Sequence, residues 1–233
     1  MEQPANKTPF KLSPSDFGFL YNECKHCFYN KVKLKQGRPA PIMPAIFTKI
    51  DNLMKEYFEN RSTKDISSEL PPGKVHFGDK WIQSRVLVDK LSGRSCFIKG
   101  RTDTVVAFDD GTHGVIDFKT SHIRPENVIK YARQLHAYAL ALEKAAPNKP
   151  HLPKISKLGL FVVEHKKIIG SVCNNMQFDL DIKWQPIERN DEMFKEFLRE
   201  VLYILNQPVS PKPDPNCGYC KYKYSHTNLS NVA

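Results

Sequence analysis

Long hydrophobic runs are missing from this chain of 233 residues. No apolar stretch approaches the roughly 20 residues that a membrane-spanning helix requires, which argues against a membrane protein. The first ten residues also lack the basic segment followed by an apolar segment that marks a secretory signal peptide, so we expect a cytoplasmic protein without disulfides. Internal repeats and low-complexity segments are missing as well, so the sequence does not indicate a repeat architecture.

The composition is that of a basic globular protein. Hydrophobic residues make up 40% and charged residues 26%, and the length suits a single domain, residues 1–233, with terminal elaborations. The net charge of +10 predicts a surface that attracts polyanions, of which nucleic-acid backbones are the commonest. Scattered surface lysines would give the same charge, but Lys31, Lys33 and Lys35 fall in one short stretch. These three lysines are therefore candidate nucleic-acid-binding residues.

The apolar pattern predicts an alternation of helices and strands. A short helix capped by Ser13 is expected to begin at Pro14 and run toward Cys24, and helical spacing recurs at residues 46–58, 125–146 and 193–205. Strand-favouring residues cover 81–88, 97–108, 113–120, 158–164 and 176–184, while the polar segment 60–79 is expected to be a loop. The predicted fold is α/β, in the order helix, three-strand antiparallel meander, helix, strand.

Two aspartates and a lysine interrupt strands that otherwise consist of core residues. Side chains alternate along a strand, so Arg101 shares a face with Asp103 on one strand, and Asp117 shares a face with Lys119 on the next. The two carboxylates can converge, and their burial requires a cation or mutual pairing. Mg²⁺ or Mn²⁺ would suit them, with Lys119 orienting a water for phosphodiester hydrolysis. An exposed cross-strand salt bridge would leave the same short D-x-K pattern.

Further motif residues accompany the two aspartates and the lysine. Gly100–Asp103, then Asp117–Thr120, then Gln134 and Tyr138 resemble the successive motifs of RecB-type and CRISPR-associated exonucleases of the PD-(D/E)XK superfamily. The resemblance implies a restriction-endonuclease-like core over about residues 44–185. It also implies that Gln134 supports the catalytic centre and contacts DNA near the scissile phosphate, with Tyr138 beside it and Arg101 as a further DNA contact.

The predicted helix at 46–58 departs from the family pattern. Related nucleases commonly carry a His or Glu there as an additional metal ligand, whereas this helix has no His, and Asp51 and Glu56 are its only acids. We expect Asp51 to be solvated, although it could turn inward. The departure keeps a second hypothesis open, namely a catalytically weak DNA-binding or assembly protein that retains the nuclease fold.

Four of the six cysteines form two C-x-x-C pairs, Cys24 with Cys27 and Cys217 with Cys220. Paired thiols in a reducing compartment bind Zn²⁺ or an iron-sulfur cluster. Many exonucleases of the resembled branch hold a [4Fe-4S] cluster with flanking cysteines, so the resemblance favours that cluster. Their usual division is one cysteine before the core and three after, and the division into two and two here keeps Zn²⁺ as the alternative.

A site built from these pairs would clip the chain ends together. Segments 12–38 and 190–224 are then expected to form a cysteine lobe beside the core. His26 lies inside the first pair and could replace a thiol, but simple exposure is the plainer expectation. Cys96 and Cys173 stand alone and are expected to be small buried residues without a metal role.

The sequence thus predicts a Mg²⁺- or Mn²⁺-dependent deoxyribonuclease. An exonuclease acting on single-stranded DNA or DNA ends, in repair, recombination or defence, is preferred because no separate base-reading motif is recognisable. Whether a helicase- or integrase-type protein partner delivers the DNA is left open.

Overall fold

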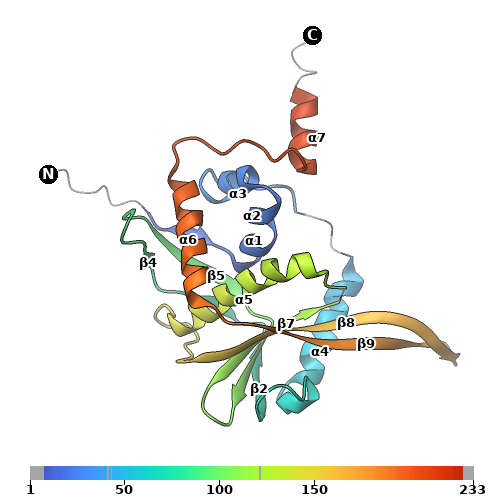
Figure 1. Cartoon of the computed structure of the whole chain (residues 1–233). Coiled ribbons are helices and arrows are strands. Elements are labelled where there is room, and N and C mark those ends of the chain that lie inside the picture. The colour runs from blue at the N-terminus through green and yellow to red at the C-terminus, as the bar shows by residue number, and fades with distance from the viewer. Residues whose placement is uncertain (1–7, 41, 43, 121, 228–233) are drawn as a thin grey trace.

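The computed structural model describes residues 8–40, 42, 44–120 and 122–227. Its helices are α1 (Pro14–Gly18), α2 (Leu20–Glu23), α3 (Lys25–Val32), α4 (Ala45–Phe58), α5 (Val128–Glu143), α6 (Asp191–Asn206) and α7 (Gly218–Thr227), with 3-10 turns at Thr63–Asp65 and Pro125–Asn127. Its strands are β1 (Phe10–Leu12), β2 (Gly73–Gly78), β3 (Trp81–Gln83), β4 (Leu87–Val88), β5 (Ser95–Arg101), β6 (Thr104–Phe108), β7 (His113–Lys119), β8 (Ile155–Val172) and β9 (Asn175–Ile187). Figure 1 shows their arrangement.

The strands form two sheets. The larger sheet has the order β2-β6-β7-β8-β9, in which β7 and β8 are parallel and the other neighbours are antiparallel. In the smaller sheet β5 is central and pairs with β1 in parallel and with β3 and β4 in antiparallel fashion. The β8–β9 hairpin reaches well beyond the other strands of its sheet (Figure 1).

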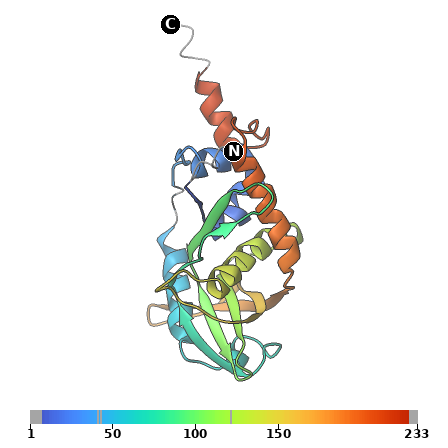
Figure 2. The ribbon, with the colours of Figure 1, turned by 90° about the vertical axis from the view of Figure 1, so that its left-hand side faces the viewer.

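The larger sheet separates two apolar cores because side chains alternate along its central strands. On β7, Val115 faces the core that holds Leu135 and Leu142 of α5, whereas Ile116 and Phe118 face the core that holds Phe58 of α4. The sheet therefore lies between α5 and α4. In the turned view α4 and α6 lie on opposite sides of the molecule (Figure 2).

The α/β class and the order helix, meander, helix, strand are confirmed, but the meander begins with a different strand. Its first strand is β2, within the segment 60–79 that was expected to be a loop. The alternation of buried Val75 and Phe77 with exposed neighbours spans only a few residues after Pro71–Gly73, so the turn signal obscured it. The segment 81–88 instead supplies β3 and β4 of the smaller sheet.

The expected strand 97–108 is also two strands. It breaks at Thr102 and Asp103, so that β5 joins the smaller sheet and β6 joins the larger one. The prediction that Arg101 and Asp103 share one strand face is therefore wrong, because no single strand carries both.

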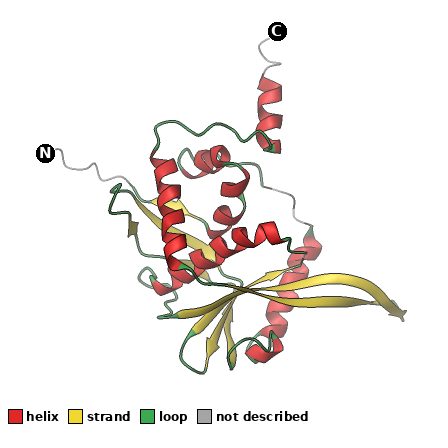
Figure 3. Cartoon of the chain, viewed as in Figure 1, coloured by secondary structure: helices red, strands yellow, loops and turns green. Residues whose placement is uncertain are grey.

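The helices at 46–58, 125–146 and 193–205 are confirmed as α4, α5 and α6, whereas the helix expected from Pro14 toward Cys24 is two short helices, α1 and α2 (Figure 3). The Ser13 side chain makes no capping hydrogen bond. Cys96 is buried as expected, but Cys173 is exposed, because it lies in the tight turn of the β8–β9 hairpin with a φ of 47°.

Candidate active centre and cysteine cluster

Asp117 lies on β7, in the middle of the larger sheet, and is only 2% exposed. It faces α5 together with Lys119, and the Lys119 ammonium forms an ion pair with Asp117 Oδ2. From α5, Gln134 Nε2 lies 3.4 Å from Asp117 Oδ1 and 3.2 Å from the Tyr138 hydroxyl. Residues 134 and 138 are one helical turn apart, so α5 presents both to the same point of the sheet.

Asp103 reaches the same point from the break between β5 and β6. Its Oδ2 accepts a hydrogen bond of 3.2 Å from the backbone N–H of Phe118, the residue after Asp117. The register of β6 and β7 fixes this approach, since Thr104 pairs with Ile116. The structure thus brings Asp103, Asp117, Lys119, Gln134 and Tyr138 together, although Asp103 arrives from a strand junction and not from a strand face.

The surroundings shift the pKa values of the two carboxyl groups in opposite directions. Burial raises the pKa of Asp117 to about 7, and the adjacent Asp103 adds to that effect while Lys119 opposes it. Burial would also raise the pKa of Asp103, but a hydrogen bond with Asp117 and the ammonium groups of Lys55 and Lys119 lower it instead. The centre therefore concentrates carboxylate oxygen atoms in a buried place where positive charge stabilises them.

Lys55 of α4 is a part of this centre that the sequence analysis missed. Its Nζ lies 3.2 Å from Asp103 Oδ1, 2.6 Å from Asp51 Oδ2 and 3.7 Å from Asp79 Oδ1, and its side chain is only 13% exposed. Asp51 therefore turns inward, where solvation had been expected. The helical spacing of Asp51 and Lys55 was visible in the sequence, but nothing local showed that α4 lies against the β5–β6 junction.

The expected nucleic-acid-binding residues do not all lie together. Arg101 is exposed and forms an ion pair with Asp79 at 2.6 Å. Lys31 and Lys35 line one groove with Arg101. Lys33 is turned away, because its ammonium donates to the backbone carbonyl of Gln207.

The donor set at the centre fits a hard divalent cation. Asp103 and Asp117 offer oxygen ligands, and Mg²⁺ or Mn²⁺ often binds through only one or two carboxylates while keeping several waters. The buried carboxyl of Asp117 would gain compensating charge from such an ion. Asp103 and Asp117 are the residues that would hold it.

The four cysteines of the C-x-x-C pairs lie together at α3 and α7. Cys24 and Cys27 flank the start of α3, and Cys217 and Cys220 flank the start of α7. The sulfur atoms lie 3.8 Å apart for Cys24 and Cys220, 3.8 Å for Cys27 and Cys217, and 3.4 Å for Cys27 and Cys220. All four lie within 4.8 Å of one another, so the cluster could hold a metal ion.

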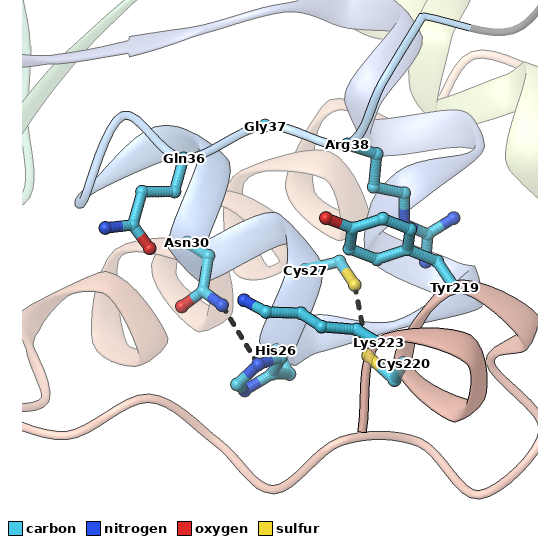
Figure 4. A pocket seen from close by; sticks show the side chains of 9 residues that line it. All are labelled: His26, Cys27, Asn30, Gln36, Gly37, Arg38, Tyr219, Cys220 and Lys223. Carbon is cyan, nitrogen blue, oxygen red and sulfur yellow. Dashed lines mark hydrogen bonds between the residues drawn. The ribbon is translucent and has the colours of Figure 1, made fainter. Parts of the chain in front are cut away.

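Polar side chains surround the cluster, and Figure 4 shows Cys27 facing Cys220 beside Arg38, Tyr219 and His26. Arg38 donates to Cys217 Sγ at 3.0 Å and is itself held by Glu23 at 2.6 Å. His26 does not join the sulfur atoms, because its ring nitrogens lie 2.9 Å from the carbonyl of Pro211 and 2.9 Å from the Asn30 amide. Four thiols with a guanidinium beside them form a site suited to a soft cation.

The match to a protein family agrees with this geometry. The chain matches the PD-(D/E)XK nuclease superfamily over residues 35–225, a span that contains the carboxylate centre and the second cysteine pair but begins after the first pair. A solved structure described as "Crystal structure of SSO0001" is similar at 16% sequence identity and a TM-score of 0.46, covering 87% of this chain and 80% of that chain. No curated protein matches the chain. Among the described residues, no helix combines the length and the apolar character needed to cross a bilayer.

Proposed function

This chain belongs to the PD-(D/E)XK nuclease superfamily, and from that premise we propose that it is a Mg²⁺- or Mn²⁺-dependent deoxyribonuclease. The superfamily implies a nuclease that binds nucleic acid. The observation that carries the proposal is the meeting of Asp103, Asp117, Lys119 and Gln134 from three separate elements at one buried point. A buried carboxylate, that of Asp117, is costly for stability alone, and so is its closeness to the mostly buried side chains of Asp103 and Lys119; a catalytic role explains their presence.

Each side chain has a distinct role in the proposed mechanism. The divalent ion, when bound, supplies Lewis-acid activation of the phosphodiester and of the attacking water. Asp103 and Asp117 would hold the ion, and the backbone N–H of Phe118 fixes the orientation of Asp103. Lys119 is placed beside Asp117 to orient the water and to offset negative charge that develops on the phosphate. Gln134 positions Asp117 and faces the phosphate, and Tyr138 fixes the Gln134 amide.

The preferred substrate and mode are single-stranded DNA or DNA ends, cleaved by an exonuclease in repair, recombination or defence. The basic net charge supports a nucleic-acid substrate, and the sequence carries no recognisable base-reading motif that would favour a sequence-specific endonuclease. In this proposal residues 44–185 form the nuclease core, and segments 12–38 and 190–224 form the cysteine lobe. Arg101, Gln134, Lys31 and Lys35 contact DNA.

For the cysteine cluster we propose Zn²⁺ in place of the iron-sulfur cluster favoured by the family resemblance. Tetrahedral Zn²⁺ with Zn–S bonds of about 2.3 Å requires sulfur atoms about 3.8 Å apart. Three of the sulfur separations are 3.4 to 3.8 Å, and all four sulfur atoms lie within 4.8 Å of one another. A [4Fe-4S] cluster binds each thiolate through a different iron and therefore requires the sulfur atoms to lie farther apart. The short separations favour a single ion.

A second candidate function follows from Lys55. On α4, Asp51 is paired with the Lys55 ammonium, and that ammonium also contacts Asp103, a proposed metal ligand. An internal cation at this place would compete with a divalent ion. The alternative is therefore a DNA-binding or assembly protein with weak cleavage.

The test is digestion of end-labelled single- and double-stranded DNA by anaerobically purified protein with Mg²⁺, Mn²⁺ or EDTA. Asp117→Ala and Lys119→Ala are compared with Asp110→Ala, which removes an exposed turn aspartate. We expect metal-dependent cleavage by the wild type and by Asp110→Ala, and none by the other two variants. DNA binding without metal-dependent cleavage in the wild type would favour the binding protein, and cleavage retained by Lys119→Ala would contradict the mechanism.

A further inference from the structure

The outer face of the smaller sheet carries cations around an exposed tryptophan. Trp81 of β3 pairs with Arg101 of β5 across the sheet, and Lys99 lies two residues before Arg101. Cross-strand partners and alternate residues share a face, so these three side chains point to one side. Ile82 and Ile98 point to the other side and are fully buried. Trp81 is 58% exposed, so the core does not account for its position.

A groove of about 490 Å³ lies over this face. Cations from four segments line it together with the tryptophan: Lys11, Lys31, Lys35, Lys99, Arg101 and Trp81. Asp16 also lines the groove, and its carboxylate is paired with Lys31 at 2.6 Å. The groove therefore combines excess positive charge with an accessible aromatic ring. That combination suits a strand whose phosphates need cations and whose bases need a flat partner.

A chain of three ion pairs connects the groove with the carboxylate centre. Arg101 is joined to Asp79 at 2.6 Å, and Asp79 lies 3.7 Å from Lys55, which contacts Asp103. The chain itself makes the same connection, because Arg101 ends β5 and Asp103 lies two residues later. A nucleic-acid strand bound in the groove would thus lie next to the carboxylate centre at the β5–β6 junction.

The floor of the groove contacts α5 as well. Gly100 lines the groove, and a Cβ atom added there would lie 2.8 Å from Pro14 and 3.3 Å from the ring of Tyr138. Tyr138 in turn lies 3.2 Å from Gln134 of the centre. A side chain at position 100 would push β5 away from α5, so the glycine allows the groove floor to lie close to Tyr138.

We propose that this groove binds single-stranded nucleic acid and guides it to the carboxylate centre, with Trp81 stacked on a base and Lys11, Lys35 and Lys99 paired with phosphates. The inference rests on the proposed nuclease function and names the substrate form of that same site. A duplex is disfavoured because its base faces are already stacked within the helix, whereas a single strand can present a base to the indole ring.

The chain contains two tryptophans, which allows a direct test. Trp184→Phe leaves Trp81 as the reporter, and Trp81→Phe leaves Trp184, which is partly buried and packs against the core that holds Phe58 of α4. Each variant is titrated in EDTA with an oligothymidylate of about 12 nucleotides, within the usual site size of single-strand grooves. We expect the oligothymidylate to quench the fluorescence of Trp81 and to leave that of Trp184 unchanged. Blunt duplex of the same length and inorganic polyphosphate should quench neither.

Binding measured by fluorescence anisotropy separates stacking from charge. We expect Trp81→Ala to weaken oligothymidylate binding about tenfold, as removal of one stacking platform does. Lys99→Glu should weaken it by a similar factor and flatten its salt dependence, because a phosphate contact is lost. The matched control is Lys166→Glu, which alters an exposed lysine of the β8–β9 hairpin and should bind as the wild type does.

These experiments distinguish a wrong groove assignment from a wrong nuclease proposal. Oligothymidylate binding with unchanged Trp81 emission and wild-type affinity in Trp81→Ala and Lys99→Glu would overturn the groove and leave the nuclease proposal intact. Equal binding of polyphosphate and oligothymidylate would show attraction by charge alone and would overturn the stacking role. Loss of all nucleic-acid binding and cleavage in the wild type would instead contradict the proposed function. Trp81→Ala does not depend on the packing of Trp184, so it decides the question if Trp184→Phe fails to fold.

Discussion

The carboxylate centre and the cysteine cluster are assembled in opposite ways. Asp103 and Asp117 are close in sequence, and adjacent strands bring them together through a tight hairpin. Cys24 and Cys220 are 196 positions apart and meet only when both chain ends fold against each other. The first site places charged groups in a buried sheet, which costs stability, whereas the second closes a very large loop, which stabilises the folded state once an ion binds.

The partners around the two sites differ in kind. The carboxylates have partners that adjust charge, namely Lys55, Lys119 and Gln134. The cysteines have apolar neighbours and one guanidinium, from Arg38. We therefore expect changes at the first site to affect cleavage and changes at the second to affect stability, and the following predictions test that separation.

The largest effect is expected for Asp117→Asn. The amide keeps the shape of the side chain but loses the charge that would hold a divalent ion, so cleavage should fall about 10⁴-fold, equal to about 5.5 kcal/mol of transition-state stabilisation. Zinc content, measured by atomic absorption, should remain that of the wild type. A parallel loss of zinc would show that the two sites are not separable.

The next effect is expected for Cys27→Ser. Removal of one thiolate should release the ion and lower the unfolding free energy by about 3 to 5 kcal/mol, or Tm by about 10 °C. Differential scanning calorimetry with metal analysis measures both quantities. Cys173→Ser is the control, because Cys173 is exposed in a hairpin turn and should change neither. If metal analysis of the wild type finds iron and its absorbance spectrum is that of an iron-sulfur cluster, the zinc assignment is wrong.

A smaller effect is expected for Lys55→Met. This change removes an ammonium 3.2 Å from Asp103 while keeping the aliphatic stem, so the carboxylates should bind Mn²⁺ about tenfold more tightly. Isothermal titration calorimetry measures the affinity. Lys49→Met, on the same helix but exposed, should leave the affinity unchanged. Weaker Mn²⁺ binding in Lys55→Met would show that Lys55 organises the carboxylates instead of competing with the ion.

The smallest effect is expected for Gln134→Ala. Its amide contacts Asp117 at 3.4 Å, a long hydrogen bond, so its loss should lower kcat about fivefold, or about 1 kcal/mol, with little change in KM. Tyr138→Phe removes the hydroxyl that fixes the amide and should lower kcat by less. An unchanged kcat in Gln134→Ala would show that Gln134 does not position Asp117 for cleavage.

Part of the fold was predictable because its signals are local. The apolar period of α4, α5 and α6 spans at least three turns each, and the alternation around Asp117 is that of a strand. The short strand β2 and the break at Thr102 were not predicted, because a few residues carry too little pattern to decide which sheet they join. The orientation of Asp51 was not predicted either, since it depends on where α4 lies.

The sequence alone determined the types of chemistry: two carboxylates on neighbouring segments with a lysine two residues after the second, and four thiols in paired spacing. Each of these patterns depends on residues only a few positions apart, so it is readable without a fold. The tertiary structure decided what surrounds them, namely Lys55 against Asp103, sulfur separations suited to a single ion, and a basic groove with Trp81 beside the centre. These features arise where segments distant in sequence pack together, and no local pattern records which segments those are.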